Sequence, residues 1–305
     1  MILSCGEALI DMLPRKSEQG EDAFAPYAGG AVFNTAIALG RLGAPSSFFS
    51  GIAGDFMGEV LLNSLKASQV GTDLCHIADL PSTIAYVKLF DGQATYAFYD
   101  ENTAGRMLTT DDLPATVDAD ALFFGGISLV AEPCGSTYEA LMMREAPNRV
   151  TMIDPNIRPS FIKDEAAYRA RIDRMLAAAD IVKLSDEDLA WLVDGDDIPA
   201  MARAILDKGA KLVCITEGAT GSHGFTATQT VFVPANKVEV ADTVGAGDTF
   251  NAGVLASLHE AGKLTKADVA ALDADTITAA LTLGNKAAAV TVSRAGANPP
   301  WANEL

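Results

Sequence analysis

The sequence predicts an α/β protein with a doubly wound, mainly parallel β-sheet flanked by helices and a small separate β-sheet that forms a lid. From about residue 111, short apolar strands alternate with helical segments, which is typical of a parallel sheet covered on both faces. Two β-rich runs over residues 83–99 flank Asp91 and Gly92, a strong hairpin signal. The extended segment 8–13 and the region before Gly29 are expected to join this hairpin in the lid.

The first part of the chain predicts core and lid elements in turn. An apolar strand over 1–6 is followed by extended chain over 8–13 and by a polar loop or small strand region over 14–26. Gly29 and Gly30 break into a helix over 31–42, which ends at Gly43. A strand over 47–52 and an amphipathic helix over 56–67 follow.

The rest of the chain predicts the regular part of the main sheet. Strands are expected at 121–125, 150–154, 181–184 and 212–216, and helices at 134–144, 165–179, 186–193 and 199–208. A β-meander over 222–233 interrupts the alternation, and helices at 246–261 and 276–292 close the fold. We expect a single domain over 1–305, with a lid formed by segments at about 8–28 and 83–100. Ligands of such sheets bind beyond the carboxyl ends of the strands, which here carry residues 6–7, 154–156, 185 and 216–218.

The composition limits the possible partners. The 305 residues include 40 Asp and Glu against 22 Lys and Arg, a formal net charge of −18. Nucleic acid is not an expected partner, because phosphate contacts need a basic face. No apolar run reaches the ~18 residues of a membrane span, and Glu7 and Asp11 interrupt any signal sequence. Four cysteines without a C-x-x-C pair fit a reduced, cytoplasmic protein. An anionic substrate would need a local positive field from a helix N-terminus, an arginine or a divalent cation.

Residues 241–251 read ADTVGAGDTFN and carry the clearest chemical signal. Gly245 and Gly247 allow successive backbone N–H groups to point at one spot, and the helix that follows adds a partial positive charge at its start. Together they predict an anion site suited to a phosphate. Asp248 lies in the first turn of this helix. It either only stabilises the helix dipole, as acids there usually do, or accepts a proton from a hydroxyl that attacks the phosphate.

Other familiar motifs do not occur in the sequence. The chain has no G-x-x-x-x-G-K-[ST] loop, no G-x-G-x-x-G after the first strand and no H-E-x-x-H pair. A P-loop enzyme and a dinucleotide dehydrogenase are therefore disfavoured. His76, His223 and His259 each stand alone, so no histidine spacing suggests zinc.

Two segments resemble the signatures of a known family. DTVGAGD at 242–248 is similar to the C-terminal signature of the ribokinase-like, or PfkB, sugar kinases, and GGAVFNTAIALGRLG at 29–43 is similar to their N-terminal signature. The two lie about 200 residues apart in the expected order, and the resemblance covers essentially the whole chain. It implies transfer of the ATP γ-phosphoryl group to a sugar hydroxyl. Asp248 then matches the general base, and Gly245, Ala246 and Gly247 match the anion hole.

On the sugar side, the resemblance implies contacts from Asp11, Gly29, Gly30 and Asn34. The Asn34 amide can both donate and accept hydrogen bonds to hydroxyls. Asp11 is an acid in an apolar stretch, which two sugar hydroxyls explain better than an unpaired, half-buried charge. A plain turn at the two glycines and a capping role for Asn34 remain the alternatives.

Three further segments resemble the fructokinase-like branch of the family: GEALIDMLP at 6–14, DPNIRP at 154–159 and KLSDEDL at 183–189. Arg158 in the second segment is expected to contact the sugar or a phosphate, with a surface salt bridge as the alternative. Arg106, in NTAGRML at 102–108, would lie near the lid and the sugar.

The resemblance also implies a nucleotide and cation side. The expected ATP contacts are Lys183, Ser185, Thr216, Gly218, Gly221 and Asn285. Asp188, or its neighbour Glu187, is expected to organise Mg²⁺ through water, where many relatives carry an Asn-x-x-Glu pattern. A monovalent cation such as K⁺ occurs in relatives near the positions of Asp242, Gly296 and Ala297.

The sequence therefore predicts an ATP-dependent sugar kinase, with fructose as the leading substrate and fructose 6-phosphate as the product. Within the same class, 2-keto-3-deoxygluconate and ribose stay open, because a few lid contacts decide the sugar. A non-catalytic sugar- or nucleotide-binding regulator that keeps the fold is the alternative from another class. Lid closure is expected to exclude water. Pairing of two lids in a homodimer would protect an exposed face of the lid sheet.

Overall fold

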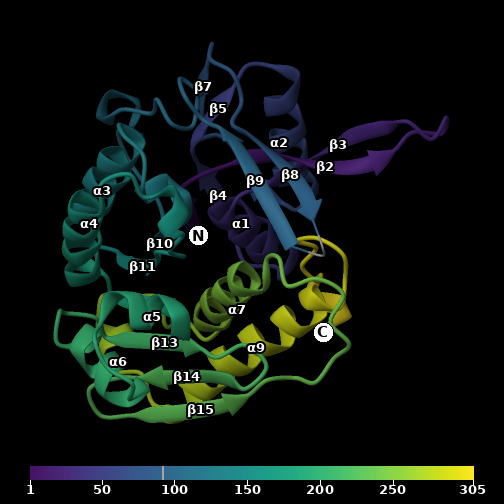
Figure 1. Ribbon diagram of the computed structural model, residues 1–305. Coiled ribbons are helices and arrows are strands. Elements are labelled where there is room, and N and C mark those ends of the chain that lie inside the picture. The colour runs from purple at the N-terminus through teal and green to yellow at the C-terminus, as the bar shows by residue number, and fades with distance from the viewer. Residues whose placement is uncertain (91–92) are drawn as a thin grey trace.

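The computed structural model describes residues 1–90 and 93–305, and its main sheet divides the molecule into layers (Figure 1). Within these ranges the sheet has nine strands in the order β15-β14-β13-β12-β11-β10-β1-β4-β6. Their bounds are Ile2–Cys5 (β1), Ser46–Phe49 (β4), Val70–Gly71 (β6), Ala121–Gly125 (β10), Val150–Asp154 (β11), Ile181–Ser185 (β12), Leu212–Thr216 (β13), Gly221–Phe225 (β14) and Thr230–Pro234 (β15). All neighbours pair in parallel except β14, which is antiparallel to both β13 and β15. The predicted mainly parallel sheet with an antiparallel meander is confirmed.

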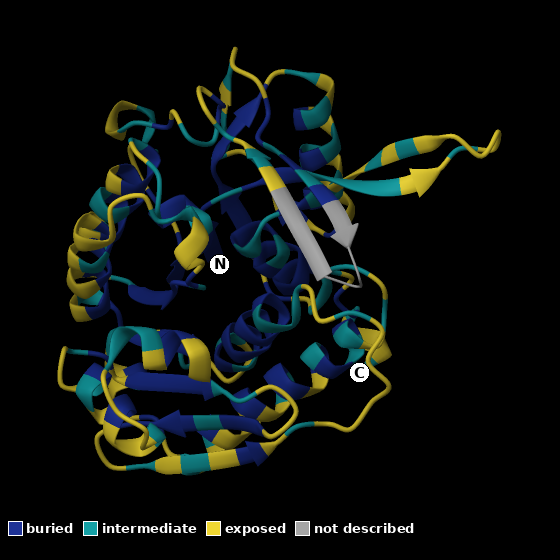
Figure 2. Cartoon of the chain, viewed as in Figure 1, coloured by how far each residue is buried: buried dark blue, intermediate teal, exposed yellow. Residues whose placement is uncertain are grey.

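Helices cover both faces of this sheet because its central strands are apolar on both sides. One core cluster contains buried residues of α1 (Ala31–Arg41), α2 (Phe56–Ala67), α7 (Ala246–Glu260), α8 (Lys266–Ala270) and α9 (Ala274–Val292). The other contains buried residues of α3 (Cys134–Glu145), α4 (Glu165–Ala178), α5 (Asp186–Leu192) and α6 (Ile198–Leu206). The burial colouring shows the central strands as a dark layer between these helices (Figure 2). The predicted helices are all present, and the short α8 was not foreseen.

A second sheet forms the lid, with the strand order β3-β2-β8-β9. Its strands are β2 (Leu9–Lys16), β3 (Asp22–Gly29), β8 (Ile84–Phe90) and β9 (Gln93–Tyr99). The predicted hairpin of β8 and β9 is confirmed by their antiparallel pairing, whereas its expected turn residues, Asp91 and Gly92, lie outside the described residues. The hairpin of β2 and β3 projects away from the body of the molecule (Figure 1).

One prediction of local structure was wrong in detail. The expected strand 47–52 is divided into β4, in the main sheet, and β5 (Gly51–Ala53), which pairs with β7 (His76–Ala78) in a separate sheet. The chain turns there because Gly51 packs so closely on the Ala104 carbonyl that any side chain would overlap it. Of the two alternatives for 14–26, the small strand region is confirmed, since β2 continues through Pro14 to Lys16 and β3 begins at Asp22.

A buried ion pair fastens the amino edge of the main sheet. The Asp180 carboxylate, just before β12, accepts hydrogen bonds from Thr151 N at 2.9 Å and from Lys266 Nζ at 2.8 Å. Lys266 is the first residue of α8 and also donates to the Ala146 carbonyl at 2.7 Å. The pair therefore ties α8 to the starts of β11 and β12, at the edge opposite the predicted ligand side.

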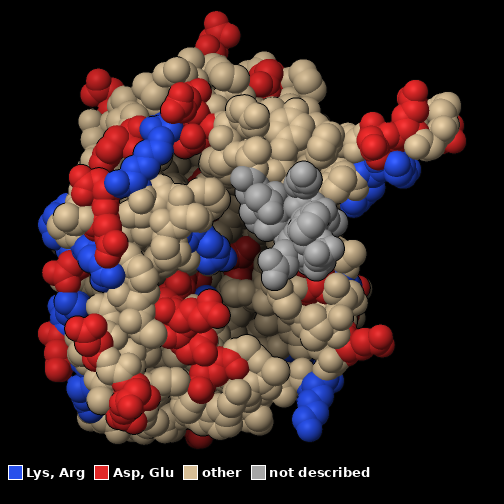
Figure 3. All heavy atoms as spheres, in the orientation of Figure 1, with Lys and Arg blue, Asp and Glu red and all other residues tan. Residues whose placement is uncertain are grey.

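The surface agrees with the acidic composition. Asp and Glu side chains are spread over the face shown in Figure 3, where they outnumber Lys and Arg. Among the helices that the structure describes, none is long and apolar enough to cross a membrane.

Candidate active site

The two signature segments meet at the carboxyl edge of the main sheet. Asn34, in the first turn of α1, donates from Nδ2 to the Asp248 Oδ2 in the first turn of α7, over 2.9 Å. The next residue, Thr35, donates from Oγ1 to the Asp248 carbonyl over 3.2 Å. The fold thus joins residues 214 positions apart in the sequence. Since Gly30 is the N-cap of α1, the alternative that Asn34 merely caps this helix was wrong.

The start of α7 differs from most helix starts in this protein. Six helices, α2, α4, α5, α6, α8 and α9, begin with a side chain that accepts a hydrogen bond from the first turn. Helix α7 begins at Gly245, which has φ 79° and no side-chain cap. A Cβ at this position would lie 2.8 Å from the Ala297 Cβ. Glycine is therefore required both by the positive φ and by the close contact with Ala297. The amides of the first turn and the helix dipole are therefore left to bind an anion.

Asp248 has the properties of a base at this anion site. Its side chain is buried, and burial raises its pKa to about 7. The charges of Asp154 and Glu7 add to this rise, whereas the Asn34 hydrogen bond and Lys183 oppose it. A carboxyl group that titrates near neutral pH is well matched to taking a proton from an alcohol.

Of the predicted sugar-side residues, Asn34 contacts Asp248, and Gly29 contacts Asp11 on the lid. Asp11 lies on β2 of the lid, and burial raises its pKa to about 6. Gly29 packs against the Asp11 carboxylate so closely that a Cβ would overlap Oδ2. Gly30, with φ 112°, would place a Cβ 2.8 Å from the Glu7 carbonyl. Both glycines therefore serve close approach, not a plain turn alone.

Glu7 is a residue that sequence reasoning noted only as a strand end. Its Oε1 accepts from Ala31 N at 2.8 Å and its Oε2 accepts from Ser128 N at 3.2 Å. The buried carboxylate thus replaces a local cap for α1 and fastens that helix to the 3₁₀ turn η2 (Gly126–Leu129). Its pKa is raised by burial. The pairing is not visible in the sequence, because the partners lie 24 and 121 residues away.

Lys183 lies beneath the start of α7 rather than at the surface. Its Nζ is 3.0 Å from Asp154 Oδ2, and Asn251 Nδ2 donates to the same oxygen over 2.7 Å. All three side chains are buried. Sequence reasoning placed Lys183 at the nucleotide but missed Asp154 and Asn251 as site residues. Their only signal was a polar residue at the end of an apolar strand and another within an apolar helix.

The predicted metal residues begin α5. Ser185 caps this helix by accepting from Asp188 N at 3.0 Å, and Asp188 Oδ1 accepts from Ile157 N at 3.1 Å. Burial raises the pKa of Asp188, whereas Glu187 is exposed. Within the described ranges no group of three metal-ligating side chains occurs. A single carboxylate fits Mg²⁺, which usually keeps its waters and shares its ligands with substrate phosphates.

The other predicted nucleotide residues lie at the β13–β15 side of the sheet. Thr216 ends β13, the turn that follows contains Gly218 with φ 50°, and Gly221, with φ 143°, begins β14. Asn285, on α9, donates from Nδ2 to the Val233 carbonyl over 3.0 Å at the end of β15. Helix α9 packs against β14 and β15, so these residues form a group of their own.

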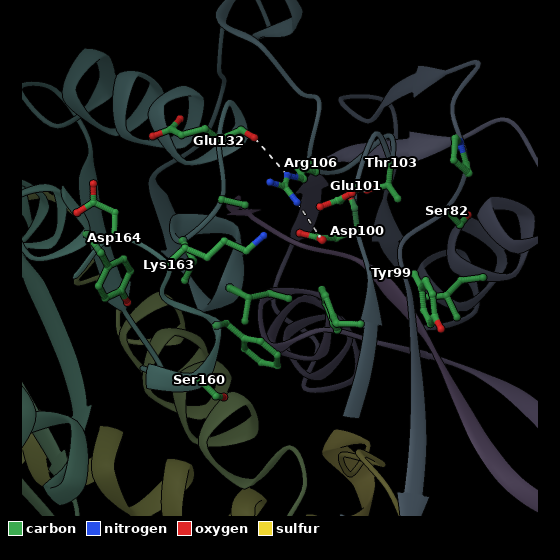
Figure 4. Close-up of a pocket in the computed structure, with 18 of the residues that line it drawn as sticks. Ser82, Tyr99, Asp100, Glu101, Thr103, Arg106, Glu132, Ser160, Lys163 and Asp164 are labelled. Carbon is green, nitrogen blue, oxygen red and sulfur yellow. Dashed lines mark hydrogen bonds and ion pairs between the residues drawn. The ribbon is translucent and has the colours of Figure 1, made fainter. Parts of the chain in front are cut away.

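The predicted arginines lie apart from Asp248. A cavity of about 1150 Å³ opens beside the lid, between its strands β8 and β9 and the loops around residues 100–106 and 160–164. Arg106 lines it, paired with Asp100 over 3.0 Å, and Lys163 extends toward the middle of the cavity (Figure 4). Phe98 of the lid contacts Phe161 of the core at a ring separation of 5.3 Å.

Arg158 is exposed, and its guanidinium donates to the carbonyl of Ile157. No ion pair of Arg158 occurs among the described residues, so the surface salt bridge is absent there.

Comparison with known proteins agrees with this geometry. The profile of the pfkB family carbohydrate kinases matches residues 1–304. A fructokinase of Rhizobium leguminosarum bv. trifolii is 63% identical over 274 residues, which cover 90% of this chain and 84% of that protein. The structure is also similar to fructokinase from Xylella fastidiosa with bound ATP, with a TM-score of 0.89 and 29% identity over 97% of this chain and 93% of that one. A double mutant of the fructokinase from Vibrio cholerae, in its fructose-, ADP- and potassium-bound form, has a TM-score of 0.84 and 26% identity over 97% and 93% of the two chains.

Proposed function

We propose that this chain, which belongs to the pfkB family of carbohydrate kinases, transfers the γ-phosphoryl group of ATP to fructose and forms fructose 6-phosphate. The observation that carries the proposal is the position of Asp248. It is a buried carboxyl group at the uncapped start of α7, fixed by Asn34 from the other signature segment. A base and an anion site then lie within one helical turn, as phosphoryl transfer to an alcohol requires.

The proposed mechanism starts with the sugar between the lid and α1. Asp11 accepts hydrogen bonds from sugar hydroxyls, while Gly29 and Gly30 keep the backbone within reach of the sugar. Asn34 holds the Asp248 carboxylate so that its second oxygen faces the attacking hydroxyl. Asp248 takes the hydroxyl proton as the oxygen attacks the γ-phosphorus in line, and the bond from this phosphorus to the β–γ bridging oxygen breaks to release ADP. The backbone N–H groups of Gly245, Ala246 and Gly247 stabilise the charge that develops on the phosphoryl oxygens.

The proposed nucleotide and cation contacts follow the cleft away from the lid. Lys183 and Ser185 lie near the phosphates, and Thr216, Gly218, Gly221 and Asn285 bind the remainder of ATP. Asp188, with Glu187 beside it, would hold Mg²⁺ through water. Mg²⁺ held there would offset the negative charge of the ATP phosphates. K⁺ near Asp242 is supported by the potassium-bound relative, and Asp242 accepts from Gly296 N at 2.9 Å in this chain.

Fructose is favoured by similarity to fructokinases, above all by the relative that is 63% identical. In the cavity beside the lid, Arg106 is proposed to contact the sugar end that does not react. Arg158 reaches the sugar or a phosphate once the cleft closes. The aromatic contact of Phe98 with Phe161 supports such a closure, because it already joins lid and core at one point.

The proposal is tested by measuring ADP release with fructose, 2-keto-3-deoxygluconate and ribose. We expect kcat/KM for fructose to exceed that for the other two sugars. Preference for either alternative would replace fructose as the substrate. Tight sugar or nucleotide binding without turnover of any sugar would instead favour the non-catalytic regulator.

We also propose that the lid pairs with a second copy of this chain in a homodimer. One face of the lid carries an aromatic cluster, in which Phe24 contacts Tyr86 and Tyr86 contacts Tyr99. Phe24 is 50% exposed and Tyr99 is 62% exposed, which is unusual for side chains of this size. Sedimentation of the wild type is expected to give a dimer, and Phe24→Asp with Tyr99→Asp a monomer. A monomeric wild type would contradict the pairing.

The four cysteines support a reducing, cytoplasmic setting for this activity. Cys5, Cys75, Cys134 and Cys214 are all free thiols, and three of them are buried.

A further inference from the structure

Three buried polar side chains from three elements meet under the start of α7. Asp154 ends β11, Lys183 lies in β12 and Asn251 lies one turn into α7. Asp154 Oδ2 accepts from Lys183 Nζ at 3.0 Å and from Asn251 Nδ2 at 2.7 Å, and its Oδ1 accepts from Asn156 N at 3.1 Å. One carboxylate therefore fixes a lysine, an amide side chain and the turn that follows β11.

The lysine head group lies directly against the first turn of α7. A Cβ at Gly247 would lie 3.0 Å from Lys183 Nζ, so a glycine there leaves room for the ammonium group. Gly247 belongs to the turn whose amides face the proposed phosphoryl group. Gly247 therefore leaves room for the Lys183 ammonium group on one side of the turn, while the backbone amides of the turn remain available to an anion.

Carboxylates surround this ammonium group. Burial alone would lower the pKa of Lys183, but the charges of Asp154, Asp188 and Asp248 raise it above the usual value. Lys183 therefore stays protonated. Asp248 in turn faces Asp154, Lys183 and Glu7, with the neutral Asn34 as its hydrogen-bond partner. The lysine is the positive charge in a group that otherwise consists of acids.

Stability alone does not explain such a pair. Removing an ammonium group and a carboxylate from water costs more than most pairs regain, and well-packed apolar residues often serve stability equally well. The side chains of Asp154 and Lys183 are only 3% and 5% exposed, so the desolvation is nearly complete. In addition, Asn251 Oδ1 is buried without a hydrogen-bond partner in the part of the chain that the structure describes. A buried polar atom without a partner adds to the free-energy cost of this arrangement.

We propose that Asp154 is a positioning residue for phosphoryl transfer, which holds the Lys183 ammonium group against the first turn of α7 so that its charge balances the transferring phosphoryl group. This role rests on the proposed kinase function. The negative charge of the transition state is spread over three phosphoryl oxygens, and a fixed charge in a water-poor site stabilises it more than a mobile one in solvent. Without the ammonium group, the side chains of Asp154, Asp188 and Asp248 would leave an uncompensated negative charge beneath the anion site.

Asp154→Asn and Lys183→Met test the role by opposite changes of charge. Asp154→Asn keeps the side-chain shape and an acceptor for Asn251, and we expect kcat to fall about 10–100-fold with KM for the sugar little changed. Its loss of a negative charge lowers the pKa of Asp248, so the acidic limb of the kcat profile moves to lower pH. Lys183→Met removes a positive charge, so the limb moves to higher pH. A purely structural defect would not move the limb in opposite directions.

A second measurement does not depend on turnover. Carbon-13 NMR of the Asp248 carboxyl group in the enzyme without substrates gives its titration directly. We expect the titration midpoint to shift downward in Asp154→Asn and upward in Lys183→Met. The shift in either variant alone tests the proposal. If one variant fails to fold, the other can still be measured. Midpoints within about 0.2 units of wild type, on the scale where one unit is about 1.4 kcal/mol, would overturn the proposal.

The chain supplies its own control in Asp180→Asn. This variant breaks the buried aspartate–lysine pair at the amino edge of the same sheet, and we expect kcat and the Asp248 titration to stay at wild-type values. Equal effects of Asp154→Asn and Asp180→Asn would also overturn the positioning role. A wild type that releases no ADP with any of the sugars tested, while the NMR shifts occur as expected, would contradict the proposed function. The electrostatic coupling of Asp154 and Lys183 to Asp248 would then still hold.

Discussion

The main sheet holds two aspartate–lysine pairs with a buried carboxylate, at opposite edges of β11 and β12. At the amino edge, Asp180 is bound by Thr151 N and by Lys266, whose side chain is 38% exposed. At the carboxyl edge, Asp154 is bound by Lys183, whose side chain is 5% exposed. Along β11 the two contacts are three residues apart, or about 10 Å. The first lysine keeps much of its hydration, whereas the second has lost nearly all of it.

We infer from this difference that the same kind of pair serves stability at one edge and, in the proposed function, reactivity at the other. At the amino edge, the Asp180 carboxylate is hydrogen-bonded to Thr151 N and to Lys266, and the Lys266 ammonium group remains partly hydrated. The desolvation free energy of this pair is therefore small. At the carboxyl edge, a dry ammonium group lies among Asp154, Asp188 and Asp248, and helix α7 begins without a side-chain cap. These arrangements are poor for folding and suited to an anionic ligand.

The largest expected effect is that of Asp248→Asn, at the carboxyl edge. The variant keeps an acceptor for Asn34 but cannot take a proton, so kcat should fall about 10²–10⁴-fold. Sugar affinity should change little, because the side-chain shape is preserved. Steady-state kinetics and calorimetric binding of fructose measure the two quantities. Turnover near the wild-type rate would remove Asp248 as the base and, with it, the contrast between the two edges.

The sequence was sufficient for most of the fold because its elements are signalled locally. Apolar runs such as 121–125 and 150–154 became strands, and periodic apolar patterns such as 56–67 became helices with nearly the expected bounds. The failures were caused by long-range packing. Residues 47–52 do not form one strand, because Gly51 meets the distant Ala104 backbone.

Part of the site could also be predicted, because the G-A-G-D segment has a local physical meaning. Asn34 could be named from resemblance, but its bond to Asp248 exists only in the folded chain. Glu7, Asp154 and Asn251 could not be assigned roles, since a buried polar residue is identified by its partners and these come from other elements. The sequence shows that such a residue is polar, but it does not show which groups the side chain binds.

The next expected effect compares the two ends of α7. Gly245 precedes the helix with φ 79°, and Gly262 follows it with φ 65° and open space around its Cα. Alanine at either position costs about 1–2 kcal/mol of backbone strain, but only at 245 does it also push against Ala297 and displace the anion site. We expect kcat/KM for ATP to fall about 10–100-fold in Gly245→Ala and to stay within about two-fold in Gly262→Ala. Equal losses would show that strain, and not the anion site, governs ATP use.

A smaller effect is expected at the amino edge. Asp180→Asn leaves Lys266 without its carboxylate, and we expect the free energy of unfolding to fall by about 1–3 kcal/mol. The loss stays in this range because the unpaired lysine can turn to solvent. Urea denaturation at neutral pH measures the loss. The folded variant should keep its wild-type kcat for fructose. A drop in kcat as large as that of Asp154→Asn would contradict the proposal that the Asp180 pair supports only stability while the Asp154 pair supports phosphoryl transfer.

The smallest expected effect concerns how the free energy of unfolding of Asp248→Asn depends on pH. Because burial raises the pKa of Asp248 to about 7, the native wild type binds this proton more tightly than the unfolded chain does. The resulting stability is fully present at low pH and is lost as the pH rises toward and through about 7. The asparagine of the variant has no such proton, so the variant should gain stability over the wild type from about pH 5 to about pH 8.

Asp273→Asn provides the control for this pH dependence. The hydrogen bond from Thr276 lowers the pKa of this helix-capping carboxyl group, so its contribution is lost only as the pH falls below about 4. Between about pH 5 and 8 the difference in unfolding free energy between Asp273→Asn and wild type should therefore be flat. Urea unfolding at both pH values gives the two differences. A flat difference for Asp248→Asn as well would show that its carboxyl group titrates as in the unfolded chain, and that the carboxyl edge carries no stored electrostatic cost there.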